Sequence, residues 1–309
     1  MEVSIHPLDR TLHAQAGDNL LDVLRANQVP ISYSCMAGRC GTCRCKVLAG
    51  RTQASGPEDS RAPMAAGQSV LACQTTLVEN CAIEIPELDE VVVQKRVRVA
   101  IPKPLDFSPG QYATLQFTPR HIRPYSMAVA HGAGELEFHI RLVPDGRVTS
   151  YVASELKVGD AIRVAGPLGT AYLRRKCEGP VVCIAGGTGL APILSILRGM
   201  LDGGMRNEVH VYFGVRTHAD LYGLEWLREL QARHAAMHLH VVVASAGDGN
   251  GYRGGVVTKA VADDWAQMQG WRAYLAGAPV MVDAASILLR QRGIDPDHIH
   301  ADAFHASGV

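Results

Sequence analysis

The sequence has little of what would mark a nucleic-acid-binding, membrane or exported protein. Of its 309 residues only 6% are aromatic, and 30 Lys and Arg balance 30 Asp and Glu. This balance favours neither nucleic acid nor a membrane surface as a partner. No apolar run approaches the roughly eighteen residues of a membrane span. The segment Met1–Ile5 lacks a basic start and an apolar stretch, so we expect no signal peptide and a cytoplasmic protein.

Metal-binding histidine motifs are also missing. The 13 histidines form no His-Glu-x-x-His pattern, and we interpret them as scattered surface or core residues. We find no internal repeat and no low-complexity segment. The chain is long enough for two or three domains, and 47% of its residues are apolar, so each domain can bury a core.

Cysteine spacing is the strongest positive feature. The gaps between four of the cysteines are four, two and twenty-nine residues, in the order Cys35, Cys40, Cys43, Cys73. This is the plant-type spacing that holds a [2Fe–2S] cluster, with three thiolates from a loop and one from a later strand. Gly38 and Gly41 let backbone N–H groups approach the sulfurs, which tunes the potential.

Zinc and disulfides are the alternatives for these cysteines. A zinc site usually shows two paired C-x2-C halves, whereas here only Cys40 and Cys43 have that spacing. The spacing therefore favours iron–sulfur over zinc, and disulfides come last. The remaining cysteines are interpreted as small buried apolar residues: Cys45, Cys81, Cys177 and Cys183.

The chain divides into three modules, at residues 1–90, 91–173 and 174–309. The first is small and mostly β, with strand-like runs at 45–48, 69–74 and 81–85 and a short helix capped by Asp18.

The second module alternates apolar and polar residues in short runs at 112–117, 136–142 and 162–164. So many short strands, separated by Gly- and Pro-rich turns, predict an antiparallel barrel.

In the third module short apolar strands alternate with helical stretches, which predicts a doubly wound parallel sheet. The expected strands are 181–185, 209–213, 239–244 and 273–275, and the expected helices are 190–201, 220–234, 257–265 and 279–290.

A four-residue motif, Arg123-Pro124-Tyr125-Ser126, lies between two strand-like runs of the second module. Arginine can hold a phosphate with two hydrogen bonds, tyrosine can lie against a ring system, and serine can hydrogen-bond a ring nitrogen. Taken alone, the motif is weak, since such a turn also occurs by chance.

The segment Gly146-Arg147-Val148-Thr149 comes before a helix expected at 150–156. A helix N-terminus suits a pyrophosphate, although an ordinary helix with Thr149 as its N-cap explains the segment equally well.

Glycine-rich turns follow two expected strands of the third module. Gly186-Gly187-Thr188-Gly189 follows the first strand, and Gly277-Ala278-Pro279 follows the strand at 273–275. Glycines allow a phosphate to approach the backbone, and ligands of open α/β sheets bind at the carboxyl ends of strands. The first turn is only an approximate dinucleotide fingerprint, and a strand-to-helix turn that binds nothing remains the alternative.

The order of four of these motifs resembles the ferredoxin–NADP⁺ reductase superfamily with an N-terminal ferredoxin domain. They are the cysteine loop, Arg-Pro-Tyr-Ser, Gly-Gly-Thr-Gly and Gly-Ala-Pro. Further stretches look like the reductase component of naphthalene- and nitroarene-type ring-hydroxylating dioxygenases: 32–35, 107–117, 166–173 and 301–304. The resemblance implies a β-grasp-like ferredoxin domain, a flavin-binding barrel and a nicotinamide domain. It also implies a [2Fe–2S] cluster, FAD, and NADH or NADPH as cofactors.

The resemblance also assigns the site residues. Arg123, Pro124, Tyr125 and Ser126 hold the flavin, with Tyr125 and Ser126 in the catalytic position. The residues near the flavin phosphates are Ile140, Arg141, Gly146, Val148 and Thr149. Phe304 covers the face of the flavin ring opposite Tyr125. The nicotinamide dinucleotide meets Gly187, Thr188, Gly189, Gly277, Ala278 and Pro279. Arg216 could attract a 2′-phosphate and Asp220 could repel it, so the sequence leaves NADH and NADPH open.

The chain departs from the family pattern at two places. Relatives carry Cys before the Gly-Ala-Pro turn, where this chain has Ala276. Only about twenty residues separate Asp89 from Gly110, with one strand-like run at 91–99. The flavin barrel is therefore expected to lack its first strand.

The resulting hypothesis is a reductase, monomeric by default, that moves electrons from NAD(P)H through FAD and the cluster to a Rieske-type ferredoxin. The sequence of a reductase does not indicate the substrate of the oxygenase that it supplies with electrons. A different acceptor, such as a di-iron hydroxylase or a deoxysugar dehydratase, stays open. A redox-sensing module without turnover is the alternative of another class, and an absorption spectrum with NADH would separate it from a reductase.

Overall fold

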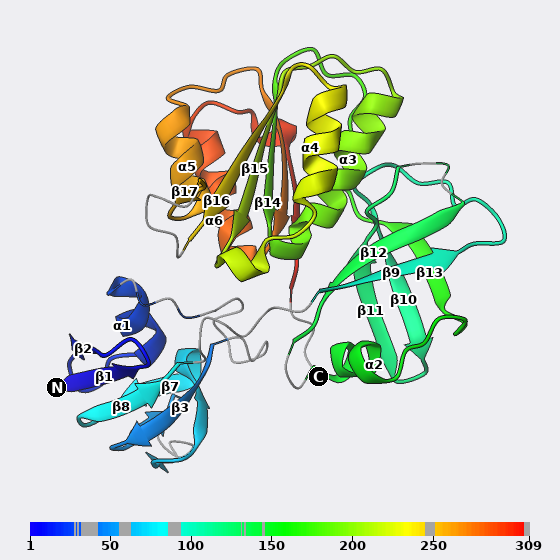
Figure 1. The fold of residues 1–309 in the computed structure, drawn as a ribbon. Helices are drawn as coiled ribbons and strands as arrows, with labels where there is room; N and C mark the ends of the chain where they lie inside the picture. The colour runs from blue at the N-terminus through cyan, green and yellow to red at the C-terminus, as the bar shows by residue number, and fades with distance from the viewer. Residues whose placement is uncertain are drawn as a thin grey trace. The chain divides into compact units, whose positions relative to one another are not determined.

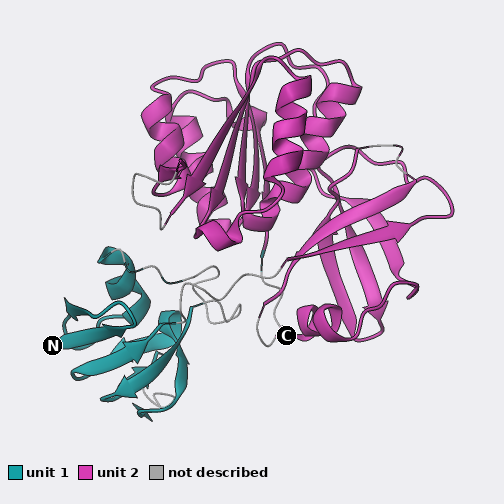
Figure 2. Ribbon diagram, viewed as in Figure 1, with its two compact units in different colours: residues 1–90, 305–309 teal, residues 91–304 magenta. Residues whose placement is uncertain are grey.

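The computed structural model describes residues 1–27, 29, 31, 43–55, 63–85, 94–130, 132, 134–143, 146–244 and 251–305. The chain forms two compact units, Met1–Glu90 with His305–Val309, and Val91–Phe304 (Figure 2). Within the described residues, no helix is long and apolar enough to cross a membrane.

The first unit is a mixed sheet that packs against one short helix, α1 (Leu20–Ala26). The sheet order is β2-β1-β8-β3-β6, with bounds Arg10–His13, Glu2–His6, Cys81–Glu84, Arg44–Ala49 and Ser69–Leu71. Strands β5 (Pro63–Met64), β4 (Thr52–Ala54) and β7 (Thr75–Leu77) form a second, small sheet.

Two local predictions in this unit were wrong. The N-cap of α1 is Asn19, whose side chain accepts hydrogen bonds from Leu21 and Asp22, while Asp18 accepts one from Gln15 instead. The run expected at 69–74 is a strand only to Leu71, because the chain then turns through a 3₁₀ helix, η2 (Ala72–Gln74). This turn carries Cys73.

The second unit begins with antiparallel strands around one apolar core. The sheets are β11-β10-β13 (His121–Ser126, Tyr112–Thr118, Arg163–Leu168) and β12-β9 (Glu135–Arg141, Gln94–Ala100), joined by a bridge between Met127 and Phe138. Residues 94–110 hold a single strand, β9, as their short length predicts. Helix α2 (Arg147–Ser154) packs beside β11, where the rings of Tyr151 and His121 stack 4.5 Å apart.

A six-stranded parallel sheet completes the second unit (Figure 1). Its order is β17-β16-β15-β14-β18-β19, with bounds Arg253–Gly254, Met237–Val243, Val209–Val215, Val181–Gly186, Arg272–Gly277 and Ile299–Ala303. One apolar core lies on the side of α3 (Leu190–Asp202) and α4 (Leu224–Arg233). The other lies on the side of α5 (Val257–Asp264) and α6 (Pro279–Gln291). The doubly wound sheet is therefore as predicted, with β19 as an extra edge strand that the sequence did not indicate.

Strand β12 is buried on both faces, although its sequence alternates apolar and polar residues. Glu137 and His139 are each 5% exposed. Their outer face is covered because His139 lies 3.1 Å from the Tyr222 hydroxyl and packs on the ring of Trp226. The antiparallel strands and the parallel sheet are thus packed together through this face.

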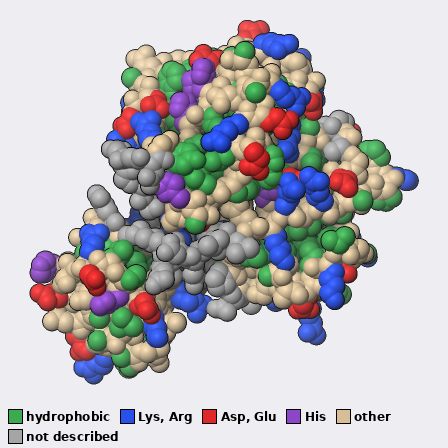
Figure 3. Space-filling model, in the orientation of Figure 1, with side chains coloured by type: hydrophobic (Ala, Val, Ile, Leu, Met, Phe, Trp, Pro, Cys, Tyr) green, Lys and Arg blue, Asp and Glu red, His purple; other side chains and the backbone are tan. Residues whose placement is uncertain are grey.

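Charged side chains show no single-sign field on the visible face. Figure 3 shows Lys and Arg interspersed with Asp and Glu there, as the balanced composition indicates.

Candidate functional site

The Arg-Pro-Tyr-Ser motif forms most of strand β11. Pro124 is tolerated because β11 is an edge strand of its sheet, where no ladder hydrogen bond is lost on the open side. Alternation along the strand puts the half-buried Arg123 and Tyr125 on one face, with the exposed Pro124 on the other. Burial raises the pKa of Tyr125 to about 12, against the opposing charge of Arg123, so its hydroxyl stays protonated at neutral pH.

Helix α2 begins at Arg147, three residues before the start predicted from the sequence. Its N-cap is Gly146, which has no side chain to cap with, so the alternative in which Thr149 is the N-cap was wrong. The Thr149 hydroxyl instead bonds back to the carbonyls of Val143 (3.0 Å) and Gly146 (3.2 Å), which fastens the turn that enters the helix. Val148 and Ile140 bury their side chains in the core, so only their backbone groups can face a ligand.

The two glycine turns lie at the carboxyl ends of neighbouring strands, β14 and β18. Gly187–Gly189 form a 3₁₀ turn, η3, that leads into α3. A Cβ on Gly189 would overlap the carbonyl oxygen of Ala276, so the two turns pack backbone against backbone. Gly277 has φ +144° and a Cβ there would lie 2.9 Å from the Gly186 carbonyl oxygen. Glycine is required at both positions for this contact.

Strand β19 connects the glycine turns to the Arg-Pro-Tyr-Ser strand. Asp302 pairs with Ala276 in the sheet, and its carboxylate accepts a 2.8 Å hydrogen bond from the Ser126 hydroxyl. The Phe304 N–H donates to the Gly277 carbonyl at 2.8 Å. The structure therefore brings Ser126, Ala276 and Phe304 together from three distant parts of the sequence.

Asp302 was not identified from the sequence as a site residue. Burial raises its pKa above the ordinary carboxyl value, and the Ser126 hydrogen bond offsets this only in part. A buried carboxyl of raised pKa beside a hydroxyl is typical of functional sites. The stretch Ala-Asp-Ala-Phe at 301–304 was the available signal.

Helix α3 fixes the antiparallel strands against the parallel sheet. The Arg198 guanidinium donates to the Ala128 carbonyl at 2.6 Å, and the Gly110 N–H donates to the Ser195 hydroxyl at 3.1 Å. Burial opposes ionisation of Glu137, but hydrogen bonds from His139 and Arg98 outweigh it and lower its pKa to about 2. The bonds of Arg198 and Ser195 join helix α3 to the segments that flank β10 and β11.

Arg216 follows β15, at the same carboxyl edge as the glycine turns. Its Nε is buried and has no hydrogen-bond partner in the described part of the chain. Asp220 is buried in a capping box, where its carboxylate accepts bonds from the N–H (2.9 Å) and hydroxyl (3.0 Å) of Thr217. The Arg216 Nε is thus unused in the described part of the chain, whereas the Asp220 carboxylate is held in place by local hydrogen bonds.

Two of the four expected cluster ligands, Cys43 and Cys73, are described, while Cys35 and Cys40 lie outside the described residues. Both described thiols are buried, and the Cys73 N–H points at the Cys43 sulfur, 3.5 Å away. They approach from different segments, the start of β3 and the η2 turn. An N–H to sulfur bond of this kind suits a thiolate that ligates a cluster.

Three cysteines outside the expected ligand set are also buried: Cys45, Cys81 and Cys183. Burial raises the pKa of Cys45 to about 12 and of Cys81 to about 11, so both remain thiols. Cys183 is fully buried and its pKa is raised to about 12 for the same reason. A thiol that stays protonated is a poor metal ligand, which agrees with the interpretation of these residues as apolar core.

Family models match three successive segments of the chain. A 2Fe-2S iron-sulfur cluster binding domain matches residues 3–78, an oxidoreductase FAD-binding domain matches 91–172, and an oxidoreductase NAD-binding domain matches 183–286. Together with the fold, they define an oxidoreductase that carries a [2Fe–2S] cluster, FAD and a nicotinamide dinucleotide.

Comparison with individual proteins narrows this class. The ferredoxin–NAD(P)⁺ reductase component of the naphthalene 1,2-dioxygenase/salicylate 5-hydroxylase systems of Ralstonia sp is 53% identical over 100% of both chains. The corresponding component of the naphthalene 1,2-dioxygenase system of Pseudomonas putida is 49% identical, again over 100% of both. The crystal structure of an Amycolatopsis cytochrome P450 reductase aligns with TM-score 0.65 and 31% identity over 99% of each chain.

The chain belongs to the family of ferredoxin–NAD(P)⁺ reductase components. The resemblance found in the sequence is therefore confirmed, and the protein is an enzyme of electron transfer.

Proposed function

We propose that this reductase passes electrons from NAD(P)H to a Rieske-type ferredoxin of an aromatic-ring dioxygenase system. The observation that carries the proposal is the meeting of Ser126, Ala276 and Phe304 around Asp302, which joins the expected flavin strand to the expected nicotinamide turn. The names of the two full-length relatives support the choice of acceptor.

The residues of β11 and α2 fit a flavin nucleotide. Arg123 supplies a fixed fork of donors for a phosphate, and the first turn of α2 offers unpaired N–H groups with the positive end of the helix dipole. Tyr125, which stays neutral, presents an aromatic face, while Ser126 and Asp302 can hold a proton beside the ring. FAD, when bound there, accepts two electrons as hydride and releases them singly.

The carboxyl edge of the parallel sheet fits a nicotinamide dinucleotide. Gly187, Thr188 and Gly189 leave the backbone open to a pyrophosphate, and Ala278 and Pro279 open helix α6 at the next strand. The Arg216 guanidinium could donate to a 2′-phosphate, and the Asp220 carboxylate is already hydrogen-bonded to Thr217. We propose that the enzyme accepts both NADH and NADPH.

Substitution of Arg216 tests this nucleotide assignment. Arg216→Gln should raise the KM for NADPH about tenfold or more, as expected for one lost charge-assisted hydrogen bond, and change that for NADH little. An equal change for both nucleotides would remove Arg216 from the 2′-phosphate site.

The modules at 1–90, 91–173 and 174–309 are proposed to act as cluster, flavin and nucleotide domains of a cytoplasmic monomer. Cys35, Cys40, Cys43 and Cys73 would hold the [2Fe–2S] cluster. Plant-type clusters have potentials near about −400 mV and Rieske centres about −150 mV or higher, so electrons would run forward to the acceptor.

The name of the 53% identical relative supports a second acceptor. That relative is named as the reductase component of both naphthalene 1,2-dioxygenase and salicylate 5-hydroxylase systems. We propose that this chain likewise supplies two oxygenases. Purified reductase should reduce the ferredoxins of both systems with similar kcat/KM. Reduction of neither, with rapid transfer to a di-iron hydroxylase instead, would overturn the proposed partner while leaving the reductase chemistry intact.

A further inference from the structure

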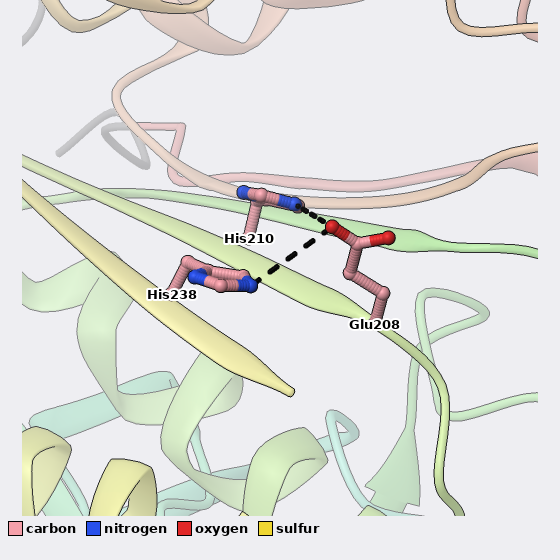
Figure 4. Close-up of side chains that lie close together, drawn as sticks. All are labelled: Glu208, His210 and His238. Carbon is pink, nitrogen blue, oxygen red and sulfur yellow. Dashed lines mark hydrogen bonds and ion pairs between the residues drawn. The ribbon is translucent and has the colours of Figure 1, made fainter. Parts of the chain in front are cut away.

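Three polar side chains gather at the amino edge of the parallel sheet, at the opposite ends of the strands from the glycine turns. Glu208 precedes β15, His210 is the second residue of β15, and His238 is the second residue of β16. His210 and His238 are paired in the register of the two parallel strands. Their rings are therefore stacked, with centroids 4.7 Å apart and planes 17° from parallel (Figure 4).

The donor atoms of these side chains converge on one point. The Nε2 atoms of His210 and His238 lie 3.0 Å and 3.9 Å from the same Oε1 atom of Glu208. All three ligand atoms lie within 4.8 Å of one another. In a tetrahedral zinc site with bonds of about 2.0–2.2 Å, two donor atoms are about 3.3–3.5 Å apart. Small side-chain rotations would therefore bring the three atoms to ligand distance.

The surroundings fix one ligand and leave the others free to adjust. The side chain of His210 is 7% exposed, whereas those of His238 and Glu208 are 51% and 48% exposed. The His210 ring packs edge-on against Trp265, and its Nδ1 lies 3.3 Å from the Nε2 of His240. A ligand histidine commonly bonds through its second nitrogen in this way, which fixes the ring orientation.

We propose that Glu208, His210 and His238 bind a divalent transition-metal ion of the zinc class, separate from the cluster and the flavin. Two imidazoles and one carboxylate are ligands that Zn²⁺ prefers, with the fourth position open to water on the exposed side. Mg²⁺ and Ca²⁺ are disfavoured because they take oxygen ligands almost exclusively. The individual histidines gave no sequence motif because two strands, nearly thirty residues apart, supply them.

Zinc binding to the full-length, cluster- and flavin-loaded protein tests the site. Equilibrium dialysis against Zn²⁺, with iron and flavin measured in the same samples, should give one Zn²⁺ per chain without loss of iron. His238→Ala and Glu208→Gln should each weaken binding at least tenfold. Glu208→Gln keeps the side-chain shape, and unchanged iron and flavin content verifies that each variant is folded.

Matched controls are His13→Ala and Glu178→Gln, which change exposed residues outside the three-residue site. Both controls should bind Zn²⁺ as the unmodified protein does. The proposal is overturned if the unmodified protein binds no Zn²⁺ at millimolar concentration, in which case the histidines serve only as a stacked cluster. Wild-type affinity in both site variants would overturn it equally.

Discussion

The two edges of the parallel sheet prepare ligand sites in opposite ways. At the carboxyl edge, Gly189 and Gly277 remove side chains so that β14 and β18 can end in turns packed backbone to backbone. At the amino edge, Glu208, His210 and His238 place side chains toward one point. A dinucleotide needs open backbone N–H groups, whereas a metal ion needs convergent donor atoms. The proposed dinucleotide site and the proposed metal site therefore lie at opposite edges of one sheet, roughly the 20 Å length of a seven-residue strand apart.

The largest effect on stability and NADH binding is expected when a side chain is added to a glycine at the carboxyl edge. Gly189→Ala puts a methyl group on the Ala276 carbonyl oxygen, and neither backbone can move without displacing the turn. We expect a fall of about 1–3 kcal/mol in unfolding free energy and a large rise in the KM for NADH. Zinc binding at the amino edge should not change.

Gly134→Ala is the matched control, because a Cβ there meets open space. Steady-state kinetics and thermal melts of both variants make the measurement. Normal NADH kinetics in Gly189→Ala would show that η3 does not hold the dinucleotide.

Loss of Arg123 tests whether a flavin binds beside the nucleotide site proposed at the carboxyl edge. Arg123→Ala should weaken FAD about ten- to a hundredfold, because each charge-assisted bond to phosphate contributes roughly 1.5–3 kcal/mol. Flavin content after dialysis at micromolar protein measures this. Full occupancy together with an unchanged melting temperature would contradict the assignment.

Asp302 should make the unfolding free energy depend on pH. Its pKa is raised in the folded protein, so the ionised form destabilises the fold at neutral pH, and this cost disappears as the pH falls below the raised pKa. Asp302→Asn should therefore gain stability over the wild type at pH 7, and the gain should shrink toward pH 4.

Flavin reduction by NADH should slow in Asp302→Asn if the carboxylate orients the Ser126 hydroxyl, whose hydrogen bond it accepts. Denaturant titrations and stopped-flow traces at several pH values measure both effects. A difference in stability that is constant with pH would argue against a raised pKa.

The smallest effect is expected at Ala276, whose side chain is 1% exposed. The family resemblance places cysteine at this position, so we expect Ala276→Cys to fit and to help position the nicotinamide. We expect flavin reduction to speed up by a few-fold, about 1 kcal/mol. An unchanged or slower rate with normal folding would mean that this site has adapted to alanine.

Local sequence patterns predicted much of the fold, but they did not predict the contact between Ser126 and Asp302 at the candidate site. The glycine turns and strands β14 and β15 were predicted because period and turn chemistry are local properties. The bond between Ser126 and Asp302 could not be predicted, since it joins residues 176 apart in the chain.

Burial of Glu137 and His139 could not be predicted either. Their strand reads as half exposed, and only the packing of Tyr222 and Trp226 covers its polar face. The N-cap positions also differ, because Asn19 caps α1 in place of the expected Asp18, and Gly146 caps α2 in place of Thr149, which was considered as an alternative.

The central claim is that hydride transfer takes place in the second unit. The cluster is then needed only for one-electron transfer to the acceptor protein. Cys73→Ser tests it most directly, because Cys73 is the lone distal ligand expected for the cluster and belongs to the first unit. NADH-dependent reduction of an artificial two-electron dye should persist, while one-electron transfer to a ferredoxin should collapse. Equal loss of both activities in a folded, flavin-loaded variant would contradict the separation.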